Sequence, residues 1–329
     1  MISKERIKRA IEFRTPDRLP MEFWAYNISD TIGLGWNQIG TGDRSKRETV
    51  DEWGCTWGRS EVANMGLVIK HPLADWATLA NYEFPDPDNV VFYAGMEEKA
   101  KNLGDKYVVT GIFMVLFERL HSLRGFEGLM LDFYMEPDKL AALTDRIVEF
   151  DVGVINNISR RFPGLIDGIR FTDDWGTELN AFISRELFDE FFKPRYKIIF
   201  DACHEAGWHV WLHSCGKITS LIPSLIDSGV NVFNLLQPRV LDIEAFGKQF
   251  AGKTCFSTCA DIQHTLPFKS PSEIDEEVQL LLRHWATPEG GFILSDYGDS
   301  QAVGVSEAAK RIMFDAYIRH DPYIRAGIY

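Results

Sequence analysis

The chain has 329 residues, of which 45% are hydrophobic and 25% are charged, a balance typical of a folded globular protein. Its formal net charge of −13 argues against a nucleic acid or an anionic membrane as the main partner, because the sequence has no long basic segment to offset it. No apolar run approaches the roughly 20 residues of a membrane span. The five cysteines, an odd number, and the absence of an apolar secretion signal predict a reducing, cytoplasmic setting.

The first third of the chain is predicted to contain short helices, one strand and a hairpin. The helices are expected at 3–12, 41–52 and 88–103, and the strand at 21–24. The segment 53–71 combines glycines, aromatic residues and alternating polarity, which favours a hairpin that acts as a flap.

From residue 107 onward, strands alternate with helices. Strands are predicted at 107–113, 168–172, 209–212, 230–236, 254–257 and 291–294. Helices are predicted at 115–133, 138–162, 184–206, 218–228, 242–250, 271–285 and 306–320. This alternation indicates βαβ units and a parallel sheet, and no glycine-rich phosphate-binding motif follows any strand.

We therefore predict an α/β fold, a single-domain (β/α)8 TIM-type barrel over residues 1–329. Residues 1–105 are expected to form an amino-terminal extension with the first strand, and residues 106–329 the main part of the barrel. Seven strands are identified in this way. The eighth, which a closed barrel needs, is expected in the hairpin region or in the long helical middle of the chain.

The active site of such a barrel lies at the carboxyl ends of its strands. His213 and Cys215 follow one of these strands, and residues two apart in a strand point to the same side. An imidazole and a thiolate together suit zinc better than magnesium or calcium. The other strand ends carry Glu118, Asp173, Asp174, Glu178, Asn234, Gln237, Cys259, Asp261, Gln263, Asp296, Tyr297 and Asp299.

Structural roles are the alternative for several of these residues. Asp173 and Asp174 are also suited to capping a turn, and Glu118 to an ion pair within its helix. Cys259 lies just past a strand, where it is either within reach of a metal or an inert thiol.

Six motifs, in this order, resemble the uroporphyrinogen decarboxylase superfamily. They are Asp173-Asp-Trp-Gly-Thr177, Phe192-Lys-Pro-Arg-Tyr196, Leu212-His-Ser-Cys-Gly216, Asn234-Leu-Leu-Gln-Pro238, Asp261-Ile-Gln263 and Gly290-Gly-Phe-Ile293. The resemblance implies a (β/α)8 barrel. True decarboxylases of this superfamily carry an arginine-rich stretch near the amino terminus, whereas this chain has Pro20-Met-Glu-Phe-Trp-Ala-Tyr26 there. The resemblance is therefore nearer to the zinc- and corrinoid-dependent methyltransferases.

The methyltransferase branch implies a zinc ion held by His-x-Cys and by a later cysteine near the last strand. His213 and Cys215 match the first part, but the later cysteine is absent, and Asp296 and Tyr297 stand in that region. Either a carboxylate replaces this thiolate, or Cys259 or Glu118 completes the ligand set, or no metal is bound.

The resemblance assigns roles to the residues at the strand ends. Asp174, Tyr297 and Asp296 are expected to be catalytic, and Gln237 and Gln263 to bind the cofactor. Glu178, Glu118 and Asn234 are expected to bind substrate, and His213, Cys215 and Cys259 to hold Zn2+.

The implied reaction moves a methyl group between a small substrate, of the methoxy, methylamine or thiol type, and a corrinoid. Because the chain lacks a corrinoid-binding motif, the corrinoid is expected on a separate partner protein. The alternatives are a decarboxylase-like lyase acting on a small carboxylated substrate and a non-catalytic protein that binds a tetrapyrrole or another small ligand. A homodimer is one prediction for the oligomeric state.

Overall fold

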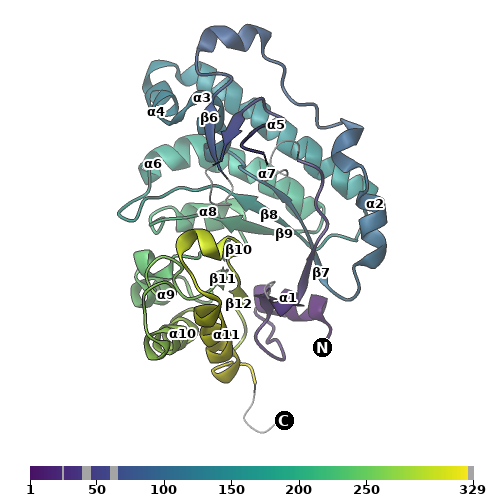
Figure 1. Ribbon diagram of the computed structural model, residues 1–329. Coiled ribbons are helices and arrows are strands. Elements are labelled where there is room, and N and C mark those ends of the chain that lie inside the picture. The colour runs from purple at the N-terminus through teal and green to yellow at the C-terminus, as the bar shows by residue number, and fades with distance from the viewer. Residues whose placement is uncertain (24–25, 39–45, 60–65, 325–329) are drawn as a thin grey trace.

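Eight mutually parallel strands form the main sheet of the protein (Figure 1). The computed structural model describes residues 1–23, 26–38, 46–59 and 66–324. In these ranges the parallel strands are β1 (Met21–Phe23), β3 (Thr31–Gly33), β7 (Tyr107–Ile112), β8 (Gly168–Thr172), β9 (His209–His213), β10 (Val232–Asn234), β11 (Cys255–Thr258) and β12 (Phe292–Ser295). Their order is β1-β12-β11-β10-β9-β8-β7-β3, and a short antiparallel strand, β2 (Ile28–Ser29), pairs with β1.

The sheet curls into a nearly closed barrel, which confirms the predicted α/β barrel. Between its two ends, the Asp30 amide donates to the Met21 carbonyl at 2.7 Å, and the Thr31 hydroxyl donates to the Glu22 carboxylate at 2.6 Å. The eighth strand is β3, which directly follows β2, so its expected location in the hairpin or the helical middle was wrong. With only three residues, β3 is too short to show a strand pattern in the sequence.

Helices surround the barrel (Figure 1). They are α1 (Ser3–Ile11), α2 (Met96–Lys99), α3 (Phe117–Arg124), α4 (Phe126–Met135), α5 (Pro137–Arg161), α6 (Arg185–Leu187), α7 (Lys193–Glu205), α8 (Ile222–Ser228), α9 (Ile243–Phe250), α10 (Pro271–Trp285) and α11 (Glu307–Arg319). Among the described residues, no helix combines the length and apolar character that crossing a membrane requires.

Two long helices of the prediction are interrupted in the structure. The predicted helix 88–103 is reduced to α2 and two 3-10 turns, because Gly95 has a φ of +80° and stops the preceding turn. The predicted helix 115–133 divides into α3 and α4 at Gly125, which has a φ of +77°.

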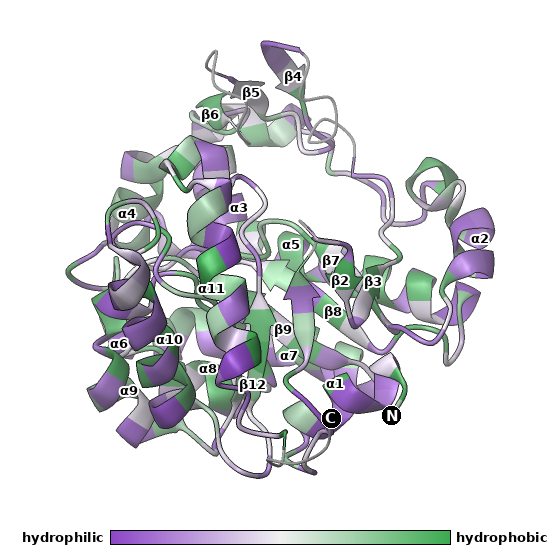
Figure 2. Cartoon of the chain, turned by 60° about the horizontal axis from the view of Figure 1, so that its bottom comes forward, coloured by the Kyte–Doolittle hydropathy of each residue, from purple (hydrophilic) through white to green (hydrophobic). Residues whose placement is uncertain are grey.

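A second, three-stranded antiparallel sheet contains β4 (Glu48–Val50), β5 (Thr56–Gly58) and β6 (Leu67–Lys70). Figure 2 shows this sheet at one edge of the molecule, away from the barrel strands. The predicted hairpin is confirmed as β5 and β6. The predicted helix 41–52 is wrong over 48–50, where Thr49 pairs with Trp57 in the neighbouring strand, while 41–45 lie outside the described residues.

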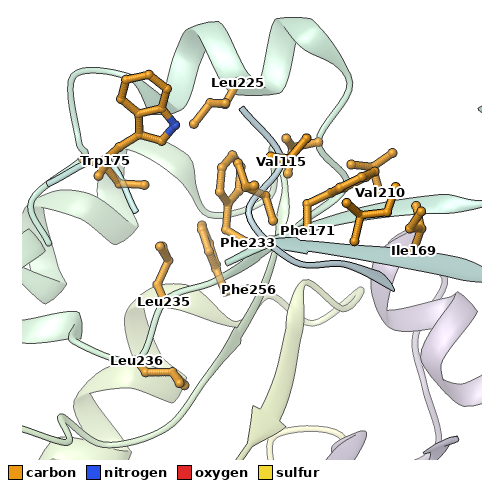
Figure 3. Close-up of a cluster of buried hydrophobic side chains, with 14 of the residues drawn as sticks. Val115, Ile169, Phe171, Trp175, Val210, Leu225, Phe233, Leu235, Leu236 and Phe256 are labelled. Atoms are coloured by element: carbon orange, nitrogen blue, oxygen red, sulfur yellow. The ribbon is translucent and has the colours of Figure 1, made fainter. Parts of the chain in front are cut away.

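The strands separate two hydrophobic layers. Side chains on the outer face, including Ile169, Phe171 and Val210, pack with helical residues such as Leu225 (Figure 3). Burial of each such side chain contributes about 1.5–3 kcal/mol to folding. The amino-terminal half of the barrel interior is also apolar and is sealed by α1; this inner cluster is formed by Ile7, Ala10, Ile11, Tyr107, Val109, Trp211, Val232, Cys255 and Ile293.

The inward positions nearer the carboxyl ends are polar. They are occupied by Glu22, Arg170, Thr172, His213, Asn234, Ser257 and Ser295. The polarity of the barrel interior therefore changes along the strands, and the groups suited to chemistry lie at the carboxyl ends, as in other barrels.

Candidate metal centre

The loops that follow β8 and β9 cross each other and bring their polar residues together. The Asp173 amide donates to the His213 carbonyl at 3.0 Å, and the Lys217 amide donates to the Thr177 carbonyl at 2.7 Å. Gly216 has a φ of +81°, and a side chain at this position would collide with the Gly176 carbonyl. Glycine is therefore required for the close approach that places Asp174 beside Cys215.

Asp174, His213 and Cys215 form a compact group of potential ligands. One donor atom from each lies within 4.8 Å of the other two. His213 Nε2 is 3.5 Å from Cys215 Sγ and 3.7 Å from Asp174 Oδ1. The Cys215 amide also donates to Asp174 Oδ1 at 2.8 Å, which fixes the carboxylate next to the thiol.

Asn234 orients the His213 ring. The Asn234 amide nitrogen donates to the Ser257 carbonyl at 2.9 Å, so its oxygen faces His213 Nδ1 at 2.8 Å and accepts a hydrogen bond from the Nδ1–H. This arrangement leaves the lone pair of Nε2 directed at the thiol and the carboxylate. A metal-binding histidine usually has such a partner on its other nitrogen.

The two separations from His213 Nε2 fit a tetrahedral zinc ion. With usual zinc–ligand lengths, tetrahedral angles separate a nitrogen from a sulfur or an oxygen by roughly 3.4–3.5 Å. The separations of 3.5 and 3.7 Å are close to these values. Nitrogen, sulfur and oxygen are also the donor set that zinc accepts, with a fourth position left for a substrate or water.

The group opens into a cavity of about 480 Å3 whose charged lining is acidic. Glu118, Asp174 and Asp299 line it, and the described residues of its wall include no lysine or arginine. Burial raises the pKa of Glu118 well above its usual range, and the charges of Asp174 and Asp173 raise it further. Burial, with a contribution from Asp174, likewise raises the pKa of the Cys215 thiol. A bound cation would offset both effects.

Asp173 positions the helix that carries Glu118. Its carboxylate accepts from the Phe117 amide at 2.9 Å and the Glu118 amide at 2.6 Å, at the start of α3, and from the Tyr196 hydroxyl. Burial raises the pKa of Asp173 to about 6, although these hydrogen bonds oppose the shift. At neutral pH the carboxylate is therefore ionised and caps α3.

Several other residues proposed from the sequence line the same cavity. Gln237 accepts from the Gly216 amide at 2.7 Å and so stabilises the loop that carries Cys215. Glu118 Oε2 and Gln263 Oε1 are buried without a hydrogen-bond partner among the described residues. Tyr297 also lines the cavity, as do Gly66 and Leu67, beside and within β6. The second sheet thus borders the cavity, as expected of the predicted flap.

The remaining sequence candidates lie elsewhere. Glu178 is 62% exposed in its side chain and faces His264 at 3.8 Å rather than the cavity. Asp296 forms a buried ion pair with Lys310 at 3.0 Å. Cys259 is only 1% exposed, lies in the hydrophobic core and is not part of the metal-binding group. The structure therefore places Asp174, and not Cys259, beside His213 and Cys215, because the Cys259 side chain, just after β11, is packed in the hydrophobic core.

Sequence reasoning missed Arg170, Lys310 and the position of Asp174 beside His213 and Cys215. Arg170 stands inside a predicted strand and Lys310 inside a predicted helix, where a charged residue is a common solvent-facing feature. The sequence signals for Asp174 were its position at a strand end and its place in the motif Asp173-Asp-Trp-Gly-Thr177, which suggested a catalytic role rather than metal binding.

Comparison with known proteins identifies a family and a shared fold. No curated protein sequence matches the chain. Among solved structures, a methyltransferase from Methanosarcina mazei is similar at a TM-score of 0.66 and 14% identity, covering 97% of this chain and 99% of the other. A D-psicose 3-epimerase has a TM-score of 0.42 at 13% identity, covering 69% and 83%, which is too distant to bear on function. The uroporphyrinogen decarboxylase (URO-D) family matches residues 54–316. Since this match spans most of the sequence, and the motifs from Asp173 to Ile293 lie within it, the chain belongs to the uroporphyrinogen decarboxylase family.

Proposed function

We propose that the protein is a zinc-dependent methyltransferase that moves a methyl group between a small methylated substrate and a corrinoid on a separate protein. The observation that carries this proposal is the group of Asp174, His213 and Cys215 at the mouth of the barrel. Membership in the URO-D family and the fold shared with the Methanosarcina mazei methyltransferase support it.

The residues that line the cavity have different proposed roles in the reaction. Asp174, His213 and Cys215 would hold zinc, which when bound supplies a Lewis acid that activates a thiol or polarises a methoxy or methylamine group. Burial and the neighbouring carboxylates favour the protonated form of Glu118, and in this form the side chain is suited to donate a proton to the departing heteroatom.

Other residues orient the substrate. Tyr297 and Gln263, whose side-chain oxygen is without a partner among the described residues, line the cavity and are suited to hydrogen-bond a substrate there. Asp296 is engaged by Lys310, so we assign proton donation to Glu118 and Tyr297 instead.

The lining of the cavity disfavours decarboxylation of a porphyrinogen. Such a substrate carries many carboxylates and needs cations to bind them. Among the described residues that line the 480 Å3 cavity there are carboxylates but no lysine or arginine.

Methyl transfer to and from free cobalamin tests the proposal. Protein loaded with zinc is incubated with methylcobalamin and 2-mercaptoethanol, and separately with reduced cobalamin and methoxy or methylamine donors, while the cobalamin absorbance is followed. We expect turnover with at least one class, loss of turnover after chelation, and recovery on adding zinc. Turnover with none of them, or an equal rate with and without zinc, would contradict the proposal.

Asn234 is predicted to tune the metal centre without binding the metal. Asn234→Ala removes the acceptor for His213 Nδ1, so the ring loses its orientation. We expect zinc affinity to fall by about 10- to 100-fold, as is usual for the loss of such a partner. Competition with a chromogenic chelator measures the affinity. The exposed Asn102→Ala variant is the matched control, and equal affinities in the two variants would exclude this role.

A further inference from the structure

A second chamber, of about 240 Å3, lies inside the barrel below the metal-binding group. His213 and Thr172 line both spaces, whereas Arg170 and Trp211, two residues earlier on the same strands, line only the lower one. The chamber is therefore adjacent to the metal group on its amino-terminal side. The interior of a TIM barrel is normally filled by layers of bulky side chains, so an open space of about 240 Å3 is unusual there.

Short polar side chains leave this space open. Ser257, Ser295 and Thr172 occupy inward positions of three strands at a level where branched apolar residues usually pack. The apolar layer toward the amino-terminal ends, which includes Trp211 and Ile293, forms the floor. A polar wall above an apolar floor is the usual character of a small-ligand site.

The two carboxylates that line the chamber are paired with cations, and Arg170 has more N–H donors than its partner Glu22 can accept. Both lining carboxylates are buried and engaged: Glu22 accepts from Thr31 at 2.6 Å and pairs with Arg170, and Asp296 pairs with Lys310 at 3.0 Å. The Arg170 side chain is 33% exposed and lies over the Trp211 ring at 5.0 Å. A guanidinium has five N–H donors. Among the described residues, Glu22 is the acceptor that contacts the Arg170 guanidinium.

We propose that this chamber binds a small carboxylate, which Arg170 holds through its guanidinium group. Arginine forms forked, charge-assisted hydrogen bonds to carboxylates, and the Trp211 ring fixes its plane. At the roughly 30 Å3 that a water molecule occupies in the liquid, the chamber has room for about eight non-hydrogen atoms.

The identity of this carboxylate as the substrate rests on the proposed function. If the carboxylate is the substrate, its carboxylate group binds Arg170 and its methyl-bearing end lies next to His213. His213 lines both the chamber and the 480 Å3 cavity. The substrate class is then a small methylated carboxylic acid. Binding of the carboxylate itself does not depend on methyl transfer.

Two probes of the same size distinguish carboxylate recognition from non-specific filling. Methoxyacetate and the neutral methoxyacetamide are titrated into zinc-free protein, and binding is followed by ligand-observed NMR. We expect methoxyacetate to bind at least about tenfold more tightly, equivalent to about 1.4 kcal/mol. Arg146→Gln, at an exposed arginine outside the chamber, should keep this preference.

The Arg170→Gln and Glu22→Gln double variant is expected to abolish the preference. Changing both partners avoids an unpaired buried carboxylate. Arg170→Lys is a second test, because lysine keeps the positive charge but lacks the paired N–H donors of a guanidinium. The preference of this variant for methoxyacetate over methoxyacetamide should be smaller than that of the unchanged protein. An unchanged preference in these variants, or equal binding of both probes to the unchanged protein, would overturn the proposal.

Cys215→Ser separates the chamber from the metal group. The variant disrupts the proposed metal site but no chamber wall, so the preference for methoxyacetate should persist. Loss of the preference in Cys215→Ser would place the carboxylate beside Cys215, outside the chamber, and would refute chamber binding. By contrast, a protein that shows the preference but no methyl transfer in any assay would refute the proposed function alone.

Discussion

Replacing Cys215 with serine is expected to remove both zinc binding and methyl transfer. In the proposed zinc site the Cys215 thiolate is one of three protein donors, and its sulfur lies 3.5 Å from His213 Nε2. Loss of a residue that only orients a ligand already costs about 10- to 100-fold in metal affinity, so loss of the ligand itself should exceed about 100-fold. Elemental analysis should find about one zinc per chain in the unchanged protein and almost none in the variant, with methyl transfer at background.

Cys259→Ala is the matched control for this prediction. Cys259 is the other cysteine that the sequence suggested as a ligand, but its thiol lies in the hydrophobic core and outside the metal-binding group. The variant should retain its zinc and lose only some stability through a small cavity. Equal loss of zinc in Cys259→Ala and Cys215→Ser would contradict the assignment of Asp174 as the third ligand.

Replacing Arg119 with methionine is expected to destabilise the protein by about 3–5 kcal/mol, the usual cost of breaking a buried ion pair on one side. Arg119 is 1% exposed, and its Nη1 donates to Asp51 Oδ2 at 2.9 Å. It also lies over the Trp53 ring at 5.2 Å. The variant leaves Asp51 without its cation in a site that water does not reach. The midpoint of urea unfolding measures the loss.

The double variant Arg119→Met with Asp51→Asn should recover part of this stability. Asparagine keeps an acceptor for the Trp53 and Cys55 amides, which donate to Asp51 Oδ1 at 3.0 and 2.9 Å, but it carries no charge. If both variants lose the same amount, the ion pair is not the cause. Because Arg119 follows Glu118 on α3 and joins this helix to the second sheet, we also expect a raised KM in the single variant.

The barrel was predictable because its pattern is local. Short strands rich in apolar residues, such as those predicted at 168–172 and 209–212, alternate with helices that have a cap or a stop along the second half of the chain. The strand β3 was missed because its pairing with β7 comes from residues more than 70 positions away. The same reason explains Glu48–Val50, where pairing with β5 overrides the helical pattern of the sequence.

The amino-acid sequence by itself determined the family and the barrel, and it indicated that His213 and Cys215 lie together because they are two residues apart at the end of a strand. In the structure β9 ends at His213, so Cys215 reaches this position from the loop that follows the strand. Only the tertiary structure decided that Asp174, and not Cys259, joins this pair, and that Arg170 faces a chamber inside the barrel. These outcomes depend on the crossing of two loops at Gly176 and Gly216 and on the direction in which neighbouring strands present their side chains. Such contacts join segments about 40 residues apart, which no local pattern encodes.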